Sequence, residues 1–358
     1  MINKERLTQN FLKLVQIDSE SGEEENIISY LKDELKRLGF NSEIDKTGNL
    51  VGCNSNEPKL LLLAHVDTVK PGKKIKPIVT EDGIVKTDGS TILGGDNKSG
   101  IAAILEILEQ INENNIKANL EIAFTVQEET GLIGSANLDV SKIKSKNAIN
   151  LDGKFGNVDS TEPAIMQFDI VINGKAAHAG LAPENGIDAV KIAANAISEM
   201  ELGRIDDETT ANVGLIKGGA ARNIVPEKII IEAEVRSRND EKFKKVCEHT
   251  KKVFETATKE YGGKIEINCM QRSRIYSLSR DQYIVDVIIK SFQKNGREAN
   301  FIPSGGITDA NNMNYFGIQC VTAGVGGENI HSTEETLKID DLILGTQIIY
   351  DAVKEIAI

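Results

Sequence analysis

The feature that most constrains the fold is a series of apolar, strand-like runs that alternate with helical patterns. Four leucines and an alanine at 60–64 form one such run, and residues 119–126 form another. Between them, apolar residues recur at helical spacing from Ile101 to Ile111. Strands that alternate with helices indicate a mostly parallel α/β sheet, whose ligands gather outside the carboxyl ends of the strands.

His65 and Asp67 stand where the first of these strands ends. Residues i and i+2 of a strand point to the same side, so the two side chains can share one face. A neutral imidazole here could bind a cation through one nitrogen while the carboxylate accepts a hydrogen bond from the other ring N–H. The alternative is a hydrogen-bonded histidine at the end of a buried strand, and this segment alone does not separate the two.

Further acidic residues follow other predicted elements. Asp96 lies in a glycine-rich loop before a helix, where it either caps the helix or holds a cation that two glycines allow the backbone to approach. Glu128 and Glu129 come directly after the second strand; they reach one site only if the backbone bends there, and otherwise form a solvated turn. Asp152 ends a third strand-like run.

The pattern changes near Ala164. From there to residue 273 the predicted order is strand, helix, strand, strand, helix, strand, which is the order of a ferredoxin-like module inserted in a larger domain. We therefore expect a catalytic domain made of residues 1–163 and 274–358, and an inserted domain of residues 164–273. A chain of 358 residues is long enough for two domains with substantial cores.

Two local predictions concern the surroundings of the first strand. Ser21 and Glu24 form a possible capping box for a helix that runs to Leu38 and stops at Gly39. The segment 75–86 has the pattern of a β-hairpin.

Composition excludes several classes of function. With 54 acidic and 42 basic residues the net charge is −12, which disfavours binding to nucleic acid or to an anionic membrane. The four cysteines are scattered singly without a C-x-x-C motif, which fits a reducing cytoplasm. The N-terminus lacks the apolar block of a signal peptide, and no apolar run is long enough to span a bilayer. We expect a cytoplasmic protein.

Five motifs taken together carry a family resemblance. They are His65-x-Asp67, Gly95-Asp96, Glu128-Glu129, Asp152-Gly153 and the segment Gly326–Ser332, which contains His331. In order and context they resemble the metal-site motifs of the co-catalytic di-zinc peptidases, which include peptidase T, bacterial glutamate carboxypeptidases, aminoacylase and succinyl-diaminopimelate desuccinylases. The resemblance covers essentially the whole chain. It is strongest to the peptidase T branch, because the ligand position after the Glu-Glu pair is an aspartate.

The resemblance implies an α/β di-zinc exopeptidase domain with a mostly parallel sheet and an inserted ferredoxin-like lid that mediates dimerisation. It implies that His65 and Asp152 hold one metal, that Glu129 and His331 hold the other, and that Asp96 bridges both. Each metal then has three protein ligands and room for a shared water, which is the open arrangement of a catalytic site. Two zinc ions per subunit are expected, and cobalt or manganese would also suit these ligands.

The resemblance also implies catalytic roles. Glu128 would be the general base that takes a proton from the shared water and passes it to the leaving amine. Asp67 would orient His65. The peptide bond between Asp96 and Asn97 would be cis.

Three residues of the inserted domain match family positions. His178 matches a histidine that reaches the active site of a neighbouring subunit and donates to the oxyanion, which predicts a homodimer formed through the lids; the alternative is a surface-loop histidine. Asn223 and Arg236 match residues that hold the substrate, and a guanidinium suits a substrate carboxylate. For Arg236 the alternative is an exposed strand arginine.

One departure from peptidase T concerns the segment 303–309. Peptidase T carries an arginine directly before a Gly-Gly-Thr-Asp loop, whereas this chain has Ser304 in that place and an additional Ile307. The departure weakens the expectation of strict aminotripeptidase specificity. It leaves Asp309 as a candidate substrate-binding residue.

The expected function is hydrolysis of short peptides. Hydrolysis of another amide, such as an N-acyl amino acid, is an alternative, because the metals and Glu128 activate water whatever flanks the carbonyl. A metal-stabilised peptide-binding protein is the non-enzyme alternative. Such a protein would not need Glu128 beside a full set of ligands, so this residue favours an enzyme.

Overall fold

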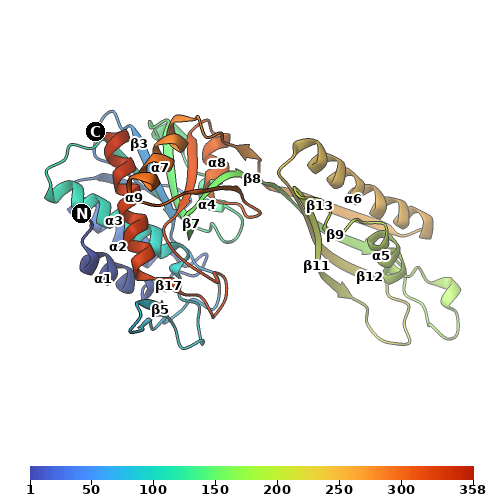
Figure 1. Ribbon diagram of the computed structural model, residues 1–358. Helices are drawn as coiled ribbons and strands as arrows, with labels where there is room; N and C mark the ends of the chain where they lie inside the picture. The colour runs from blue at the N-terminus through green and yellow to red at the C-terminus, as the bar shows by residue number, and fades with distance from the viewer. The chain divides into compact units, whose positions relative to one another are not determined.

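The computed structural model describes residues 1–358, which divide into two compact units. The main unit comprises Met1–Glu162 and Tyr276–Ile358, and the inserted unit comprises Pro163–Ile275. The expected limits of the inserted domain, 164 and 273, lie one and two residues inside these bounds. Both units combine helices with a sheet (Figure 1).

The main unit is built on a nine-stranded sheet with the order β1-β2-β6-β3-β7-β16-β8-β14 and with β15 beside β8. Its central strands β6, β3, β7 and β16 are parallel, so the predicted mostly parallel sheet is confirmed. The strands are β1 (Asn41–Ile44), β2 (Leu50–Cys53), β3 (Leu60–His65), β6 (Leu120–Thr125), β7 (Asn147–Phe155), β8 (Asn157–Glu162), β14 (Tyr276–Ser277), β15 (Asn300–Pro303) and β16 (Gln319–Gly324).

Burial explains why β3 and β6 lie at the centre of the sheet. Every residue of both strands is buried, as expected for parallel strands covered on both faces. Helix α3 packs on β3 and β7, and α1 and α9 pack on α3. The helices are α1 (Lys4–Val15), α2 (Glu25–Arg37), α3 (Gly95–Glu113), α4 (Ile133–Ala136), α7 (Tyr283–Lys294), α8 (Asp309–Tyr315) and α9 (Ile339–Ala357), with a 3-10 turn at Val140–Lys142.

A second, three-stranded sheet in the main unit has the order β17-β5-β4. Strands β4 (Ile78–Val79) and β5 (Ile84–Lys86) are antiparallel and form the predicted hairpin. Strand β17 (Leu337–Lys338) joins β5 from the C-terminal part of the chain.

The inserted unit has a five-stranded antiparallel sheet in the order β10-β11-β12-β9-β13. Its two helices share one apolar cluster with the sheet, which includes Phe168, Ile231 and Phe254. The predicted order of elements is confirmed, with the short strand β10 added. The elements are β9 (Ala164–Asn173), a 3-10 turn (Pro183–Asn185), α5 (Ala189–Ser198), β10 (Gly203–Arg204), β11 (Thr209–Gly218), β12 (Lys228–Ser237), α6 (Asp240–Tyr261) and β13 (Lys264–Ser273).

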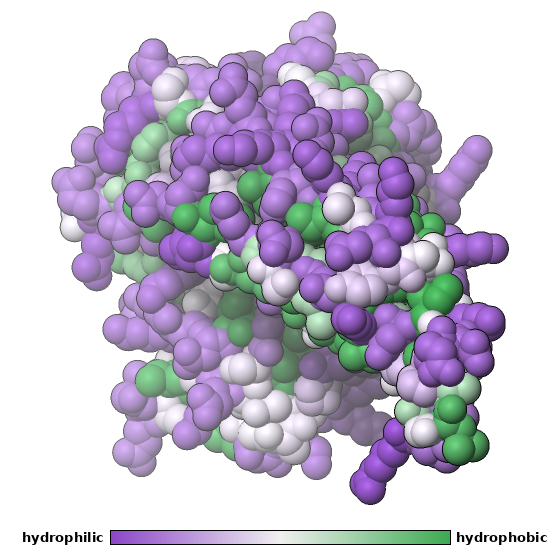
Figure 2. Space-filling view, turned by 90° about the vertical axis from the view of Figure 1, so that its right-hand side faces the viewer, coloured by the Kyte–Doolittle hydropathy of each residue, from purple (hydrophilic) through white to green (hydrophobic).

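Hydrophilic residues dominate the face of the molecule drawn in Figure 2, in keeping with a chain of which 27% is charged. No helix is both long enough and apolar enough to cross a bilayer.

The predicted capping box at the start of α2 is wrong. Glu24 occupies the N-cap position but makes no side-chain cap hydrogen bond. Its carboxylate instead accepts hydrogen bonds from the backbone N–H groups of Gly22 and Gln127, at 2.9 and 3.1 Å. Ser21 donates to Asp67, at 2.7 Å. Glu24 thus contacts the turn that follows β6, and Ser21 contacts the segment that follows β3, where buried polar groups also need partners.

The predicted end of the third strand is wrong as well, because β7 continues past Asp152 to Phe155. Gly153 has a positive φ of 87°. The register between β7 and β16 shifts between Thr322 and Gly324, opposite this segment. The sequence pattern ends at Asp152 because a bulge interrupts it, and a bulge redirects side chains without ending a strand.

Candidate metal centre

Three side chains meet at the carboxyl end of the parallel strands. His65 ends β3, Asp96 lies at the start of α3, and Glu129 follows β6. One ligand atom from each lies within 4.8 Å of the others. The Nε2 atom of His65 is 3.1 Å from Oδ1 of Asp96. Imidazole and carboxylate together form a donor set that suits zinc and other divalent transition metals.

His331 joins this cluster from the C-terminal part of the chain. Its Nε2 lies 3.3 Å from Oδ2 of Asp96 and 2.9 Å from Oε2 of Glu129. The two carboxylate oxygens of Asp96 therefore face two different histidines, Oδ1 toward His65 and Oδ2 toward His331. A carboxylate placed in this way can bridge two cations.

Two further carboxyl groups belong to the same environment. Burial raises the pKa of Glu128 well above its usual range, and the charges of Asp152 and Asp309 add to this against the opposing effect of His65. Burial and the charge of Asp96 likewise raise the pKa of Asp152. Buried carboxylates this close together disfavour one another's ionisation, and a divalent cation would remove that repulsion.

The residues present fit a bound metal on a second ground. Oε1 of Glu129 is buried and has no hydrogen-bond partner, while Oε2 contacts His331. A buried carboxylate oxygen without a partner is costly, and it is a ready ligand for a cation.

Asp67 organises the turn that presents the two glutamates. Its Oδ1 accepts a hydrogen bond from the backbone N–H of Glu128 at 2.9 Å, and its Oδ2 accepts one from that of Glu129 at 3.2 Å. Nδ1 of His65 lies 3.1 Å from the backbone carbonyl oxygen of Asp67 and 3.4 Å from Oδ1. Although burial lowers the pKa of His65, its contacts with Asp67 and Asp96 hold that pKa well above the usual value.

The backbone bends after β6 in the way that both glutamates require. Gln127 and Leu132 have positive φ values of 52° and 60°, and Gly131 has one of 105°. The N–H groups of Gly131 and Leu132 both donate to the carbonyl oxygen of Glu128. Near the start of α3, the peptide bond between Asp96 and Asn97 is cis, as the resemblance implies.

Asp309 lies at the start of α8 and is only 1% exposed. Its Oδ2 accepts a hydrogen bond from Thr125, which pairs with His65 in the sheet, and its Oδ1 has no partner. A side chain buried to this degree is better suited to support the cluster than to contact a substrate directly.

Comparison with known proteins decides the family. Residues 61–355 match the family model described as Peptidase family M20/M25/M40. The chain belongs to this family. Uncharacterized protein YqjE of Bacillus subtilis (strain 168) is 40% identical to this M20 peptidase over 372 residues, which cover 100% of both chains.

Two solved structures are similar to this M20 peptidase over 99% of each chain. A tripeptidase from Staphylococcus aureus subsp. aureus Mu50 has a TM-score of 0.95 and 40% identity. Aminopeptidase PepT from Bacillus cereus ATCC 10987 has a TM-score of 0.90 and 37% identity. The predicted family, fold and enzyme class, those of a peptidase T-like metallopeptidase, are confirmed.

The inserted unit of this M20 peptidase holds two of the predicted residues on adjoining loops. The N–H of Ala179, next to His178, donates to the carbonyl oxygen of Asn223, at 2.9 Å. Nδ1 of His178 accepts hydrogen bonds from the N–H groups of Gly180 and Leu181, at 3.2 and 3.1 Å. A neutral imidazole that accepts at Nδ1 carries its proton on Nε2, so His178 presents an N–H donor to its surroundings.

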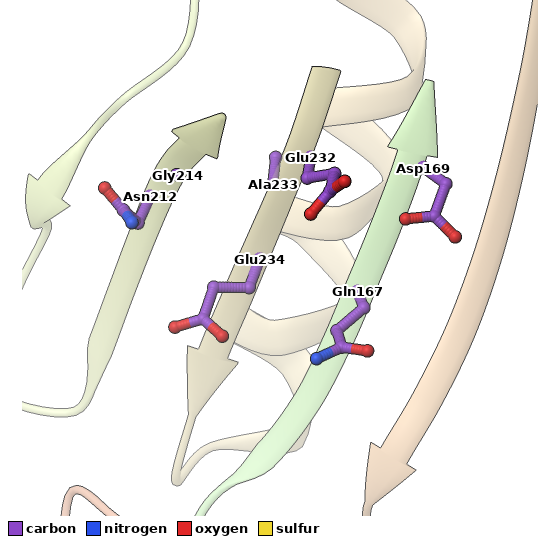
Figure 3. Close-up of a pocket in the computed structure, with 7 residues that line it drawn as sticks. All are labelled: Gln167, Asp169, Asn212, Gly214, Glu232, Ala233 and Glu234. Atoms are coloured by element: carbon purple, nitrogen blue, oxygen red, sulfur yellow. The ribbon is translucent and has the colours of Figure 1, made fainter. Parts of the chain in front are cut away.

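Arg236, the third predicted residue of this unit, forms a bidentate ion pair with Glu234 on the same strand. The Nε–Oε1 and Nη2–Oε2 distances are 2.8 and 3.1 Å. Glu234 also lines a pocket of about 220 Å³. Three carboxylates line this pocket, that of Asp169 on β9 and those of Glu232 and Glu234 on the neighbouring strand β12 (Figure 3).

Sequence reasoning missed several supporting residues of the site. Ser21 and Thr125 both contact carboxylates that are remote in sequence, at Asp67 and Asp309. Ser21 has the pattern of a helix cap and Thr125 lies inside a predicted strand, and neither pattern points to a contact with a distant carboxylate.

Proposed function

We propose that this M20 peptidase hydrolyses short peptides, with tripeptides as the first candidates, at a centre of two divalent cations. The observation that carries the proposal is the position of Asp96, whose two carboxylate oxygens face His65 and His331. The tripeptidase and the aminopeptidase to which the chain is 40% and 37% identical support the choice of substrate.

Five residues would hold the cations. His65 and Asp152 would bind one, Glu129 and His331 would bind the other, and Asp96 would bind both. Zinc is the proposed metal, and cobalt or manganese would suit the same ligands. When bound, the two cations would polarise the scissile carbonyl and lower the pKa of water.

The remaining site residues would orient groups and move a proton. Glu128 would accept the proton from water and return it to the leaving amine, a task that suits a carboxyl group whose pKa burial raises. Asp67 would keep both glutamates directed at the centre through their backbone N–H groups. Asp309, at the start of α8, would support His65 through Thr125, the residue that pairs with His65 in the sheet.

Substrate selection would fall to the inserted unit. His178, with its proton on Nε2, would donate to the oxyanion, and Asn223 on the adjoining loop would hold the substrate's backbone. Arg236 would bind a substrate carboxylate. That carboxylate would compete with Glu234 for the guanidinium, because both would use its bidentate face.

A homodimer formed through the inserted unit is part of the proposal. The edge of β11 supports this proposal, because β10 pairs only with Thr210 and Ala211 and leaves the rest of that edge open. The exposed Ile216, with 56% of its surface accessible, lies farther along β11. Unpaired strand edges of this kind readily pair with another chain. We place the protein in the cytoplasm, where single cysteines stay reduced.

Reconstitution tests the proposed activity. Metal-free protein is loaded with zinc and assayed against dipeptides, tripeptides and N-acyl amino acids, and the bond that is cut is identified by mass spectrometry. We expect metal-dependent cleavage of tripeptides. Exclusive cleavage of N-acyl amino acids would favour the alternative amide substrate. Zinc and peptide binding without any cleavage would favour a binding protein.

A further inference from the structure

A buried glutamate outside the proposed ligand set lies on a second hairpin, residues 328–336, which carries His331. Glu335 follows His331 by four residues and is only 1% exposed. The hairpin is closed by two backbone hydrogen bonds between Glu328 and Thr336, at 2.9 and 3.0 Å. Burying a carboxylate is unfavourable unless it is hydrogen-bonded, so its partners are informative.

This carboxylate accepts hydrogen bonds from three backbone N–H groups, all in the loop that contains Asp96. Oε2 of Glu335 accepts from Leu93 at 2.9 Å and from Gly94 at 2.8 Å. Oε1 accepts from Asp96 itself, at 3.0 Å. A Cβ atom on Gly95 would lie 3.1 Å from Oε1, so the loop and the carboxylate are in close contact along its length.

The loop needs such an acceptor because the helix does not supply one. Gly94 adopts the left-handed conformation, with φ 71° and ψ 25°. Asp96 and Asn97, which precede the regular part of α3, have non-helical backbone angles. The first N–H groups of a helix have no partner within the helix. Glu335 therefore satisfies donors that would otherwise be buried without a partner.

His331 depends on the same hairpin for its position. Its side chain is 50% exposed, whereas that of His65 is 2% exposed and packed at the end of β3. Little packing therefore holds His331 in place beyond its contacts with Asp96 and Glu129. A link between the hairpin and the loop of Asp96 would keep Nε2 of His331 at its 3.3 Å distance from Oδ2 of Asp96.

We propose that Glu335 is a positioning residue of the metal centre. By binding the backbone of residues 93–96 from the hairpin that bears His331, it holds the bridging carboxylate and this histidine at ligand distance from each other. The inference rests on the proposed function, since it presumes that these residues bind cations. The cation that Glu129 and His331 would hold would depend most on Glu335, because His331 lies on the same hairpin.

The test compares Glu335→Gln with Glu334→Gln, a matched control at the adjacent, exposed position. Glutamine keeps the volume of Glu335 but has a single acceptor oxygen, so at least one of the three N–H groups loses its partner. Zinc is titrated into each metal-free protein by calorimetry, and the thermal midpoint of each metal-free protein is recorded. We expect E335Q to bind one of the two zinc ions about 10–100-fold more weakly, and E334Q to match the wild type.

A second variant covers the case in which E335Q does not fold. In Gly95→Ala, the new methyl group would push against Oε1 of Glu335 while the carboxylate itself is kept. We expect this variant to bind the same zinc ion more weakly than the wild type, by a smaller factor than E335Q. Wild-type zinc affinity in folded E335Q, or in Gly95→Ala if E335Q does not fold, would overturn the inference. So would a lowered thermal midpoint with unchanged affinity, which is the result of a purely structural role. Absence of zinc binding by the wild type would instead overturn the metal centre itself.

Discussion

At the scale of single residues, Asp67 shows how one buried carboxylate serves several groups. It accepts hydrogen bonds from Ser21 and from the backbone of both glutamates, and it lies against the ring of His65. Although burial raises the pKa of Asp67, its contacts with His65 and Ser21 hold that pKa below the usual value. Its orientation is therefore set by its neighbours, and it in turn orients Glu128.

Glu128→Gln removes the proton acceptor while keeping the size and shape of the side chain. General-base catalysis contributes about 10²–10⁴-fold to a rate, so we expect kcat for peptide hydrolysis to fall by about this factor. The zinc content should stay at the wild-type level, because Glu128 is not a proposed ligand. Steady-state kinetics and metal analysis of the purified variant check both expectations. A variant that turns over at a near-normal rate would rule out the proposed base.

Glu162 is another buried carboxyl group whose pKa is shifted, and it is not one of the proposed metal ligands. Burial and the charge of Asp159 raise the pKa of Glu162 to about 8, although Tyr276 and Thr308 donate hydrogen bonds to it. The titratable groups that face it are Asp159 on β8, Tyr276 on β14 and Cys320 on β16. The folded state therefore binds this proton more tightly than the unfolded state does.

Glu162→Gln should change how stability depends on pH. Because the pKa of Glu162 is higher in the folded state, its contribution to stability is present below about pH 4.5 and is lost as the pH rises toward 8, by up to about 1.4 kcal/mol per pH unit. Glutamine resembles the protonated carboxyl group, so the variant should match the wild type near pH 5 and exceed it at pH 8. Thermal midpoints measured across this range check the prediction, and parallel curves for the two proteins would contradict it.

At the scale of elements, the packing of α3 against β7 brings two proposed ligands together. A Cβ atom on Gly100 would lie 2.1 Å from the carbonyl oxygen of Leu151 and 2.5 Å from Oδ1 of Asn97. Only a glycine allows the helix to approach the strand this closely. The approach sets the spacing of Asp96, at the start of α3, from Asp152, on β7.

Gly100→Ala should therefore separate α3 from β7. We expect a loss of about 1–3 kcal/mol in the free energy of unfolding, as for other overpacked sites, together with weaker zinc binding. Gly305→Ala is the control, since no atom lies within 4 Å of the position of its Cβ. Urea unfolding and zinc titration measure the two effects. An unchanged urea midpoint for Gly100→Ala would show that the helix can move without cost.

At the scale of the whole molecule, the proposed dimer predicts that two inactive variants complement each other. If His178 serves the site of the partner subunit, a hybrid of one Glu128→Gln subunit and one His178→Ala subunit contains one complete site. Such hybrids, purified through two different tags, should show about half of the wild-type activity, whereas each parent stays nearly inactive. Hybrids as inactive as both parents would mean that His178 serves its own subunit, and a monomer in solution would contradict the dimer.

The sequence by itself determined the residue types of the candidate ligands, the order of the elements and the central strands. Continuous apolar runs such as 60–64 are local patterns, and they reflect burial on both faces directly. The candidate ligands are recognisable from one sequence, because His65, Glu129 and Asp152 come at or near the ends of strand-like runs, and the order of all the motifs resembles that of a known family. The pattern at Asp152 misled only about the end of β7, since a bulge looks like a strand end in one dimension.

Only the tertiary structure decided which side chains hold the ligands in place. Ser21 reaches Asp67 across 46 residues, and Glu335 reaches Leu93 across 242. Hydrogen bonds between such distant residues leave no periodicity in the chain, because they depend on how separate loops meet after the sheet has formed. For the same reason, the sequence pattern at Ser21 predicts a local helix cap, whereas in the folded chain this side chain donates a hydrogen bond to Asp67.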